Sequence, residues 1–141
     1  MHPIHKGPTK ALASAQTLTG SLVASTEACD VSLASHCELH VDYAQGTGGT
    51  SPKLELEVET RCESSDTWRD PSVGDAGTPS GGAVAIALTT TTYTLAATAG
   101  VSFTVPCHGA RDLRVKVRET GTPSPYGSVS VRAVPVRLGG A

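Results

Sequence analysis

Apolar and polar residues alternate with a period of two along most of this chain, which is the pattern of β-strands that bury one face. The alternation is clearest over 37–43 and 54–62, where every second residue is Leu, Val, Tyr, Thr or Cys. Shorter runs of the same kind occupy 18–25, 29–33, 83–88, 92–95, 101–105, 113–118 and 128–134. About eight short strands separated by turn residues predict an all-β fold, a single antiparallel β-sandwich of jelly-roll type.

Two pairs of consecutive runs predict β-hairpins. In the first, 37–43 pairs with 54–62, which places Val41 opposite Val58 and Cys37 opposite Cys62. In the second, 113–118 pairs with 128–134, with Val115 opposite Val131. A slip of one residue would turn an apolar face toward water, so the pattern specifies these registers strongly.

The first sixteen residues, MHPIHKGPTKALASAQ, combine Pro, Gly, Lys and His and show no strand pattern. We therefore expect an N-terminal arm at 1–16 and a β-sandwich domain at 17–141. The arm is either disordered or draped over a neighbouring molecule, and it is not expected to join the core. The long excursion 63–82 and the Pro-rich loop 121–127 are further candidates for intermolecular contact.

Composition narrows the possible partners. The chain has 141 residues, of which 38% are hydrophobic and only 17% charged, with 15 Gly and 9 Pro. Such frequent Gly and Pro disfavour long helices. A net charge of −2 leaves no excess of basic residues that would bind nucleic acid. No run approaches the roughly 20 apolar residues of a membrane-spanning segment. We therefore expect a soluble domain without a signal peptide and without nucleic-acid or membrane partners.

Four cysteines, Cys29, Cys37, Cys62 and Cys107, are candidates for disulfide bonds. The first predicted hairpin favours a Cys37–Cys62 pair and leaves Cys29 and Cys107 to pair or to stay free. A thiolate–imidazole metal site could use His36, Cys37, Cys107 and His108. Because adjacent residues of a strand point to opposite faces, those ligands would not converge, and we expect no metal and no cofactor.

The charged and aromatic residues suggest no catalytic site. Glu55, Glu57 and Glu59 share one outward face, while the second predicted hairpin carries an outward basic row of Arg114, Lys116, Arg118 and Arg132. Both rows are either solvated or meet across a subunit boundary. Trp68 is expected to plug the core, with sugar stacking as the alternative. No nucleophile sits in a context that supplies an oriented base, so we expect no enzyme.

Several segments resemble small β-sandwich virion proteins of tailed bacteriophages. These segments read HVDYAQG at 40–46, LELEVE at 54–59, SDTW at 65–68, DLRVKV at 112–117 and SVSV at 128–131. In that family a strand ending in Tyr-x-x-Gly precedes a strand of alternating Val, Leu and Glu and a Trp-containing turn. The resemblance covers much of the chain, and the four Cys and five His depart from the family pattern.

The resemblance implies a non-enzymatic structural protein, most specifically a capsid decoration (cement) protein that stabilises the phage head across capsid subunits. A neck, collar or spike component is one alternative, and a carbohydrate- or host-receptor-binding module is another. It also implies synthesis in the host cytoplasm, residence in the virion, the major capsid protein or other virion proteins as partners, and a homo-oligomer, with a trimer favoured. The residues expected to contact the capsid are Ile4, His5, Lys6, Lys10, Trp68 and Arg69.

Overall fold

The structure, a computed structural model, describes residues 4–69, 76–80, 83–86, 92–107 and 109–138. Within these ranges every regular element is a β-strand, so the predicted all-β class is confirmed. None of the described segments is a helix that could cross a membrane. The strands are β1 (Ile4–Lys6), β2 (Lys10–Thr17), β3 (Val23–Ala24), β4 (Cys29–Asp30), β5 (His36–Ala44), β6 (Lys53–Arg61), β7 (Ala76–Ser80), β8 (Ala83–Ile86), β9 (Thr92–Leu95), β10 (Ala99–Pro106), β11 (Asp112–Thr120) and β12 (Ser128–Leu138).

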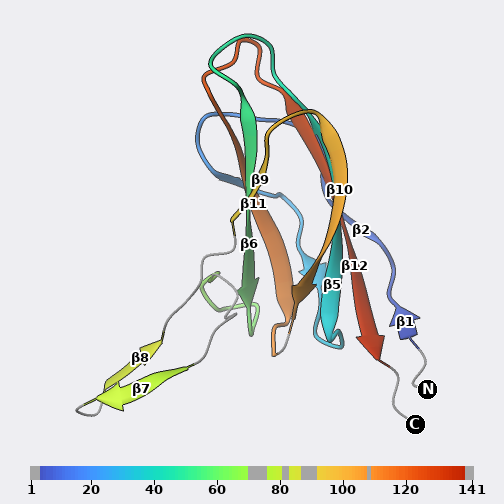
Figure 1. The fold of residues 1–141 in the computed structure, drawn as a ribbon. Coiled ribbons are helices and arrows are strands. Elements are labelled where there is room, and N and C mark those ends of the chain that lie inside the picture. Colours follow the sequence, from blue (N-terminus) through green and yellow to red (C-terminus); the bar gives the residue numbers. More distant parts are fainter. Residues whose placement is uncertain (1–3, 70–75, 81–82, 87–91, 108, 139–141) are drawn as a thin grey trace.

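Two five-stranded antiparallel sheets pack as a sandwich (Figure 1). Sheet A has the order β1-β12-β5-β10, and β2 also pairs with β12. Sheet B has the order β3-β11-β6-β9, and β4 also pairs with β11. The chain therefore crosses from sheet A to sheet B after β2, β5 and β10 and returns to sheet A after β4, β9 and β11, with a separate β7–β8 ribbon between β6 and β9 in the sequence. This strand order is that of a jelly roll, so the predicted class of sandwich is confirmed.

Both predicted hairpins are wrong in their partners. Strand β5 belongs to sheet A and β6 to sheet B, and the same division separates β11 from β12. The observed pairs are β5 with β12, where Val41 lies opposite Val131, and β6 with β11, where Val58 lies opposite Val115. An alternating pattern specifies which face of a strand is buried but not which strand lies beside it. The connecting segments 45–52 and 121–127 span the two sheets instead of turning within one.

The predicted inward faces are nevertheless confirmed. Val58, Val115 and Val131 are fully buried, and Val41 is 2% exposed. They belong to one hydrophobic cluster that fills the space between the sheets and consists largely of Val and Leu. Because Val and Leu are the main large apolar side chains, the sandwich core is thin and depends on close packing of both sheets.

The N-terminal segment is part of the sandwich. Strand β1 pairs with the end of β12, where Ile4 lies opposite Leu138, and β2 pairs with the earlier part of β12. Leu12 and Ala13 are buried in the core. The expectation that residues 1–16 stay outside the core is therefore wrong for β2. Alternation is weak here because the β2–β12 register shifts twice between Val129 and Arg132, which breaks the two-residue period.

Other predicted strands are shorter than the pattern suggested. The runs 18–25 and 29–33 contain only the two-residue strands β3 and β4. Both strands lie beside β11. Backbone hydrogen bonds from Ser25 N to Val115 O and from Val31 N to Arg111 O keep the chain next to β11 just after each of these short strands. Part of the excursion 63–82, at 70–75 and 81–82, lies outside the described residues, as do the last two residues of the predicted strand 83–88.

Candidate functional site

A groove of about 690 Å³ lies between the β1–β2 edge of sheet A and the segment around β4. It is larger than the hollow between β9 and β10 described below. One side is formed by the N-terminal strands, the other by residues 28–34, and the end of β12 contributes as well. The residues that line it are His5, Lys6, Gly7, Pro8, Lys10, Ala28, Cys29, Asp30, Ser32, Leu33, Ala34, Pro135, Val136 and Arg137.

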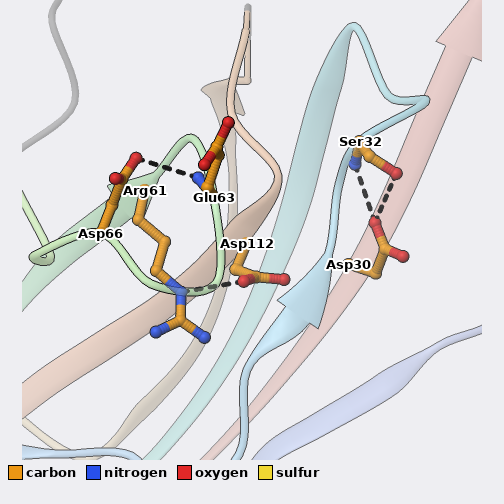
Figure 2. A network of polar contacts seen from close by, with 6 residues as sticks. All are labelled: Asp30, Ser32, Arg61, Glu63, Asp66 and Asp112. Atoms are coloured by element: carbon orange, nitrogen blue, oxygen red, sulfur yellow. Dashed lines mark hydrogen bonds and ion pairs between the residues drawn. The ribbon is translucent and has the colours of Figure 1, made fainter.

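Local backbone interactions shape both walls of the groove. Gly7 N donates a hydrogen bond to Pro135 O at 2.7 Å, and a Cβ atom at this glycine would lie 2.7 Å from Pro135 Cγ. Only glycine therefore allows the link between β1 and β2 to approach β12 this closely. On the opposite wall, Asp30 Oδ1 accepts hydrogen bonds from Ser32 N at 2.9 Å and Ser32 Oγ at 2.6 Å (Figure 2). These two bonds lower the pKa of Asp30 and fix the turn that follows β4.

The groove combines positive charge with exposed apolar surface. Lys6, Lys10 and Arg137 contribute positive charges to its lining, whereas Asp30 contributes a negative one. Lys10 Nζ lies 3.3 Å from Glu27 Oε2, but both side chains are about half exposed, so this ion pair is weak. Leu33, at the rim, is 75% exposed. An extended segment with acidic and apolar side chains matches this lining.

The structure divides the residues expected to contact the capsid between two places. His5, Lys6 and Lys10 line the groove, and Ile4, which is 65% exposed, lies in the same strand as His5 and Lys6. Arg69 instead pairs with Thr60 of β6, through reciprocal backbone hydrogen bonds of 2.7 and 2.9 Å. Trp68 and Arg69 therefore lie beside β6 of sheet B.

Trp68 does not plug the core. It is half-buried, and two guanidinium groups lie over its ring, that of Arg61 at 4.3 Å and that of Arg114 at 4.4 Å from the ring centroid. Arg61 Nε also donates to Asp112 Oδ2 at 2.8 Å, as Figure 2 shows. Arginine over an aromatic face is a favourable cation–π arrangement, so Trp68 packs against the outer face of sheet B.

The acidic and basic rows meet within one molecule. The β6–β11 register places Glu55 opposite Arg118, Glu57 opposite Lys116 and Glu59 opposite Arg114. Arg118 Nε lies 2.7 Å from a Glu55 oxygen, and Arg114 Nε lies 2.9 Å from a Glu59 oxygen. The charged rows are partly exposed on the outer face of sheet B, as the solvated alternative expected, and they also pair with each other within the chain. Arg132 lies apart from them, in β12 of sheet A.

A buried carboxylate that the sequence analysis overlooked lies at the end of the sandwich where loops 45–52 and 121–127 cross (Figure 1). Glu119 is fully buried. It accepts hydrogen bonds from Tyr43 Oη, from Gly46 N at 2.8 Å and from Gly127 N at 2.7 Å. Glu119 continues the inward-facing row of Leu113, Val115 and Val117. A charged residue at an inward-facing position of a strand could therefore have indicated this buried carboxylate from the sequence. Three donors satisfy this carboxylate, which suits a structural role.

Three of the four cysteines gather inside the sandwich. Cys29, Cys37 and Cys107 are buried free thiols in the common core, whereas Cys62 is an exposed free thiol. The predicted Cys37–Cys62 pair is wrong, because Cys37 lies in β5 of sheet A and Cys62 follows β6 of sheet B. Among the described residues, no three His, Cys, Asp or Glu side chains form a group that could hold a metal ion. His108, one of the considered ligands, lies outside those residues.

A second, smaller hollow of about 190 Å³ opens between β9 and β10 at the opposite edge of the sandwich. Its lining is mainly apolar and includes Tyr93, Leu95, Val101 and Phe103. The rings of Tyr93 and Phe103 stack with centroids 3.9 Å apart and an interplanar angle of 27°. Because these rings stack on each other across the two sheets, they close this edge of the core.

Comparisons with known proteins support the fold. A scan against family models and a search of curated proteins gave no match. Among solved structures, the crystal structure of the SPBc2 prophage-derived protein YomS is similar, with a TM-score of 0.52, 14% identity and 96% coverage of both chains. A protein of the Bacillus endospore appendages, a family of disulfide-linked pili, gives a TM-score of 0.42 at 15% identity, covering 99% of this chain and 92% of the other. The chain thus shares its fold with a prophage-encoded protein.

Proposed function

We propose that this chain is a non-enzymatic structural protein of a tailed-phage virion, and most specifically a capsid decoration protein. The proposal is supported by the resemblance of its strand and turn segments to small virion proteins and by a jelly-roll fold similar to that of a prophage-derived protein. Decoration proteins act by burying surface across capsid subunits, so many weak sites together stabilise the shell. Such a role requires a rigid sandwich and an exposed contact surface.

The groove carries the proposal, because it is the described surface best suited to hold a segment of another protein. Its occupant is an extended, acidic and partly apolar segment of a capsid subunit. The acidic side chains of that segment pair with Lys6, Lys10 and Arg137, and its apolar side chains cover Leu33. Buried apolar area supplies affinity in such a contact, while charge complementarity mainly supplies orientation and association rate.

Two alternatives remain distinct from this proposal. A neck, collar or spike component would use the same groove on a different virion surface. A carbohydrate-binding module would need an aromatic ring that is free to stack on a sugar. Two arginines already lie over the ring of Trp68, and Tyr93 and Phe103 stack on each other, which favours the structural role over glycan binding.

The test uses the purified full chain and heads from a phage in which the corresponding gene is deleted. We expect the chain to co-sediment with these heads at a fixed ratio of copies to capsid subunits. Lys6→Glu and Leu33→Ser should each weaken this association about tenfold or more, since both side chains are exposed and line the groove. Lys53→Glu, an equal charge change at an exposed residue of β6, is the matched control and should bind like the wild type.

Co-sedimentation with tails or neck complexes alone would favour the neck, collar or spike alternative. Binding to a glycan array that Trp68→Ala abolishes would instead favour the carbohydrate-binding alternative. Light scattering with and without reductant gives the native mass, and we expect a discrete homo-oligomer, with a trimer favoured. A monomer under both conditions would limit assembly to the capsid surface.

A further inference from the structure

Three thiols from separate parts of the sequence meet at the end of the sandwich nearest the groove. Cys29 is the first residue of β4 and lies opposite Leu113 of β11 in sheet B. Cys37 lies in the middle strand pair of sheet A, opposite Val105 of β10 and Pro135 of β12. Cys107 directly follows β10, and its N–H donates to Ser35 O at 3.1 Å, which places it diagonally across from Cys37.

The central thiol of this group belongs to Cys37. Cys37 lies opposite Pro135, which lines the groove together with Cys29, and Cys107 lies two residues beyond Val105, the other register partner of Cys37. Contact with Cys107 and burial raise the pKa of Cys37 to about 12, although its contact with Cys29 acts in the opposite direction. The pKa of Cys29 is also raised, chiefly by its contact with Cys37 and then by burial. Cys29 and Cys37 are therefore protonated, neutral thiols at physiological pH.

The three thiols differ in how they can be reached from solvent. Cys29 is only 3% exposed, yet it is the one of the three that lines the groove, so a small molecule inside the groove reaches this residue before the other two. Cys37 and Cys107 are 0% and 1% exposed and lie behind it in the core. An oxidant in the groove can therefore react first with Cys29, and Cys37 and Cys107 can react only after it.

We propose that Cys29, Cys37 and Cys107 form a redox site that holds one intramolecular disulfide, and that Cys37 always supplies one of its two sulfurs. The inference is independent of the proposed virion role. Because Cys29 lies in sheet B and Cys37 in sheet A, a bond between them joins the two sheets covalently. A bond between Cys37 and Cys107 instead ties β5 to the end of β10 within sheet A.

The oxidant is a low-molecular-weight disulfide such as oxidised glutathione. The Cys29 thiol loses its proton and attacks one glutathione sulfur, which forms a mixed disulfide and releases the first glutathione thiolate. The Cys37 thiol then loses its proton, attacks the Cys29 sulfur, forms the Cys29–Cys37 bond and releases the second glutathione thiolate. The protons lost by the two cysteines are taken up by the two glutathione thiolates. Attack by Cys107 on the Cys37 sulfur can move the disulfide and regenerate the Cys29 thiol.

The experiment exposes the folded, fully reduced chain to oxidised glutathione, blocks the remaining thiols with iodoacetamide and maps the linked peptides by mass spectrometry. We expect two blocked and two linked cysteines per monomer, with Cys37 in every intramolecular link. Cys62→Ser, a change at the exposed cysteine, is the matched control and should retain the intramolecular disulfide. Oxidation of this control should raise its Tm by about 5–10 °C, because the new bond restricts the unfolded chain.

Cys37→Ser should lose the intramolecular disulfide under the same conditions. Peptide mapping of the wild type identifies the linked pair directly, so the proposal stays testable even if that variant folds poorly. A link between Cys29 and Cys107, a link that uses Cys62, or four unlinked thiols in the folded wild type would each overturn it.

Discussion

Tyr43 donates its phenolic hydroxyl to the buried carboxylate of Glu119, and this bond connects strand β5 of sheet A with strand β11 of sheet B. The same carboxylate accepts the backbone N–H groups of Gly46 and Gly127, which belong to the two loops that cross between the sheets. One side chain therefore holds both sheets and both crossing loops in a fixed relation. Charge-assisted bonds of this kind are stronger than bonds between neutral groups, and leaving a buried partner unpaired is costly.

Glu119→Gln should lower the free energy of unfolding by about 2–3 kcal/mol, because the neutral amide cannot accept all three bonds at full strength. Tyr43→Phe should lower it by about 1.5–3 kcal/mol. Urea unfolding of both single variants and the double variant measures the coupling between them. Glu63→Gln, at an exposed position, is the control and should change stability by less than about 0.5 kcal/mol. Strict additivity of the two single changes would contradict the bond.

Stability should fall at alkaline pH because of the buried thiols. In the unfolded chain a thiol ionises near 9.0, whereas Cys37 in the folded chain keeps its proton to about 12 and the pKa of Cys29 is also raised. The folded state therefore binds more protons above pH 9, and stability present below that pH is lost as the pH rises. Each thiol should contribute a loss of about 1.4 kcal/mol per pH unit above this point.

Urea unfolding between about pH 8 and pH 11 in the presence of a reductant tests this dependence. Cys37→Ala should make the decline shallower, whereas Cys62→Ser should leave it unchanged. Burial also raises the pKa of Tyr43 above its ordinary value of 10.0, so Tyr43→Phe should reduce the loss above pH 10. A free energy of unfolding that stays constant across this pH range would show that the buried thiols do not keep their protons in the folded chain.

The N-terminal strands should contribute unequally to stability. Leu12 is 1% exposed and packs in the core, so Leu12→Ala should cost about 2–5 kcal/mol. Ile4 is 65% exposed in β1, so Ile4→Ala should cost less than about 0.5 kcal/mol. Deleting residues 1–16 should therefore destabilise the domain, contrary to the expectation of a separable arm. Equal denaturation midpoints for the full chain and the truncated chain would contradict this.

Trp68→Ala should lower the free energy of unfolding by about 1–2 kcal/mol, because two cation–π contacts and the packing of the ring are lost. Trp68→Phe should recover part of this loss, since a smaller aromatic face remains available to Arg61 and Arg114. Chemical denaturation followed by circular dichroism measures both variants without relying on the tryptophan signal. An Ala variant as stable as the wild type would show that the ring does not pack against these arginines in solution.

The strands with strong alternation could be predicted from the sequence, and their partners could not. Leu39, Leu56 and Val115 are buried as their periodicity requires, since the two-residue period directly fixes the face. The predicted pairing of β5 with β6 failed because a loop of ordinary length can either turn within one sheet or cross to the other. Only the packing of the whole sandwich decides between these outcomes.

The candidate sites were less predictable than the fold, because they depend on contacts between distant segments. His5 and Lys6 reach the groove only because β1 pairs with β12, and their sequence neighbourhood gives no sign of that pairing. Cys29, Cys37 and Cys107 come from both sheets, and no spacing rule brings them together. Glu119 could have been noticed, since it is the one charged residue in an otherwise apolar inward row of β11.

The outer face of sheet B and the groove differ in their balance of charge, and this difference can orient the molecule as it approaches a charged partner. On the outer face of sheet B, three glutamates lie opposite three cations, Arg114, Lys116 and Arg118, so their fields cancel at a distance. Around the groove, the cations Lys6, Lys10 and Arg137 outnumber the carboxylates of Asp30 and of Glu27, which pairs with Lys10. A negatively charged partner, such as the proposed capsid segment, would therefore be drawn to the groove before contact. Added salt should slow this steered association while changing the rate of release much less.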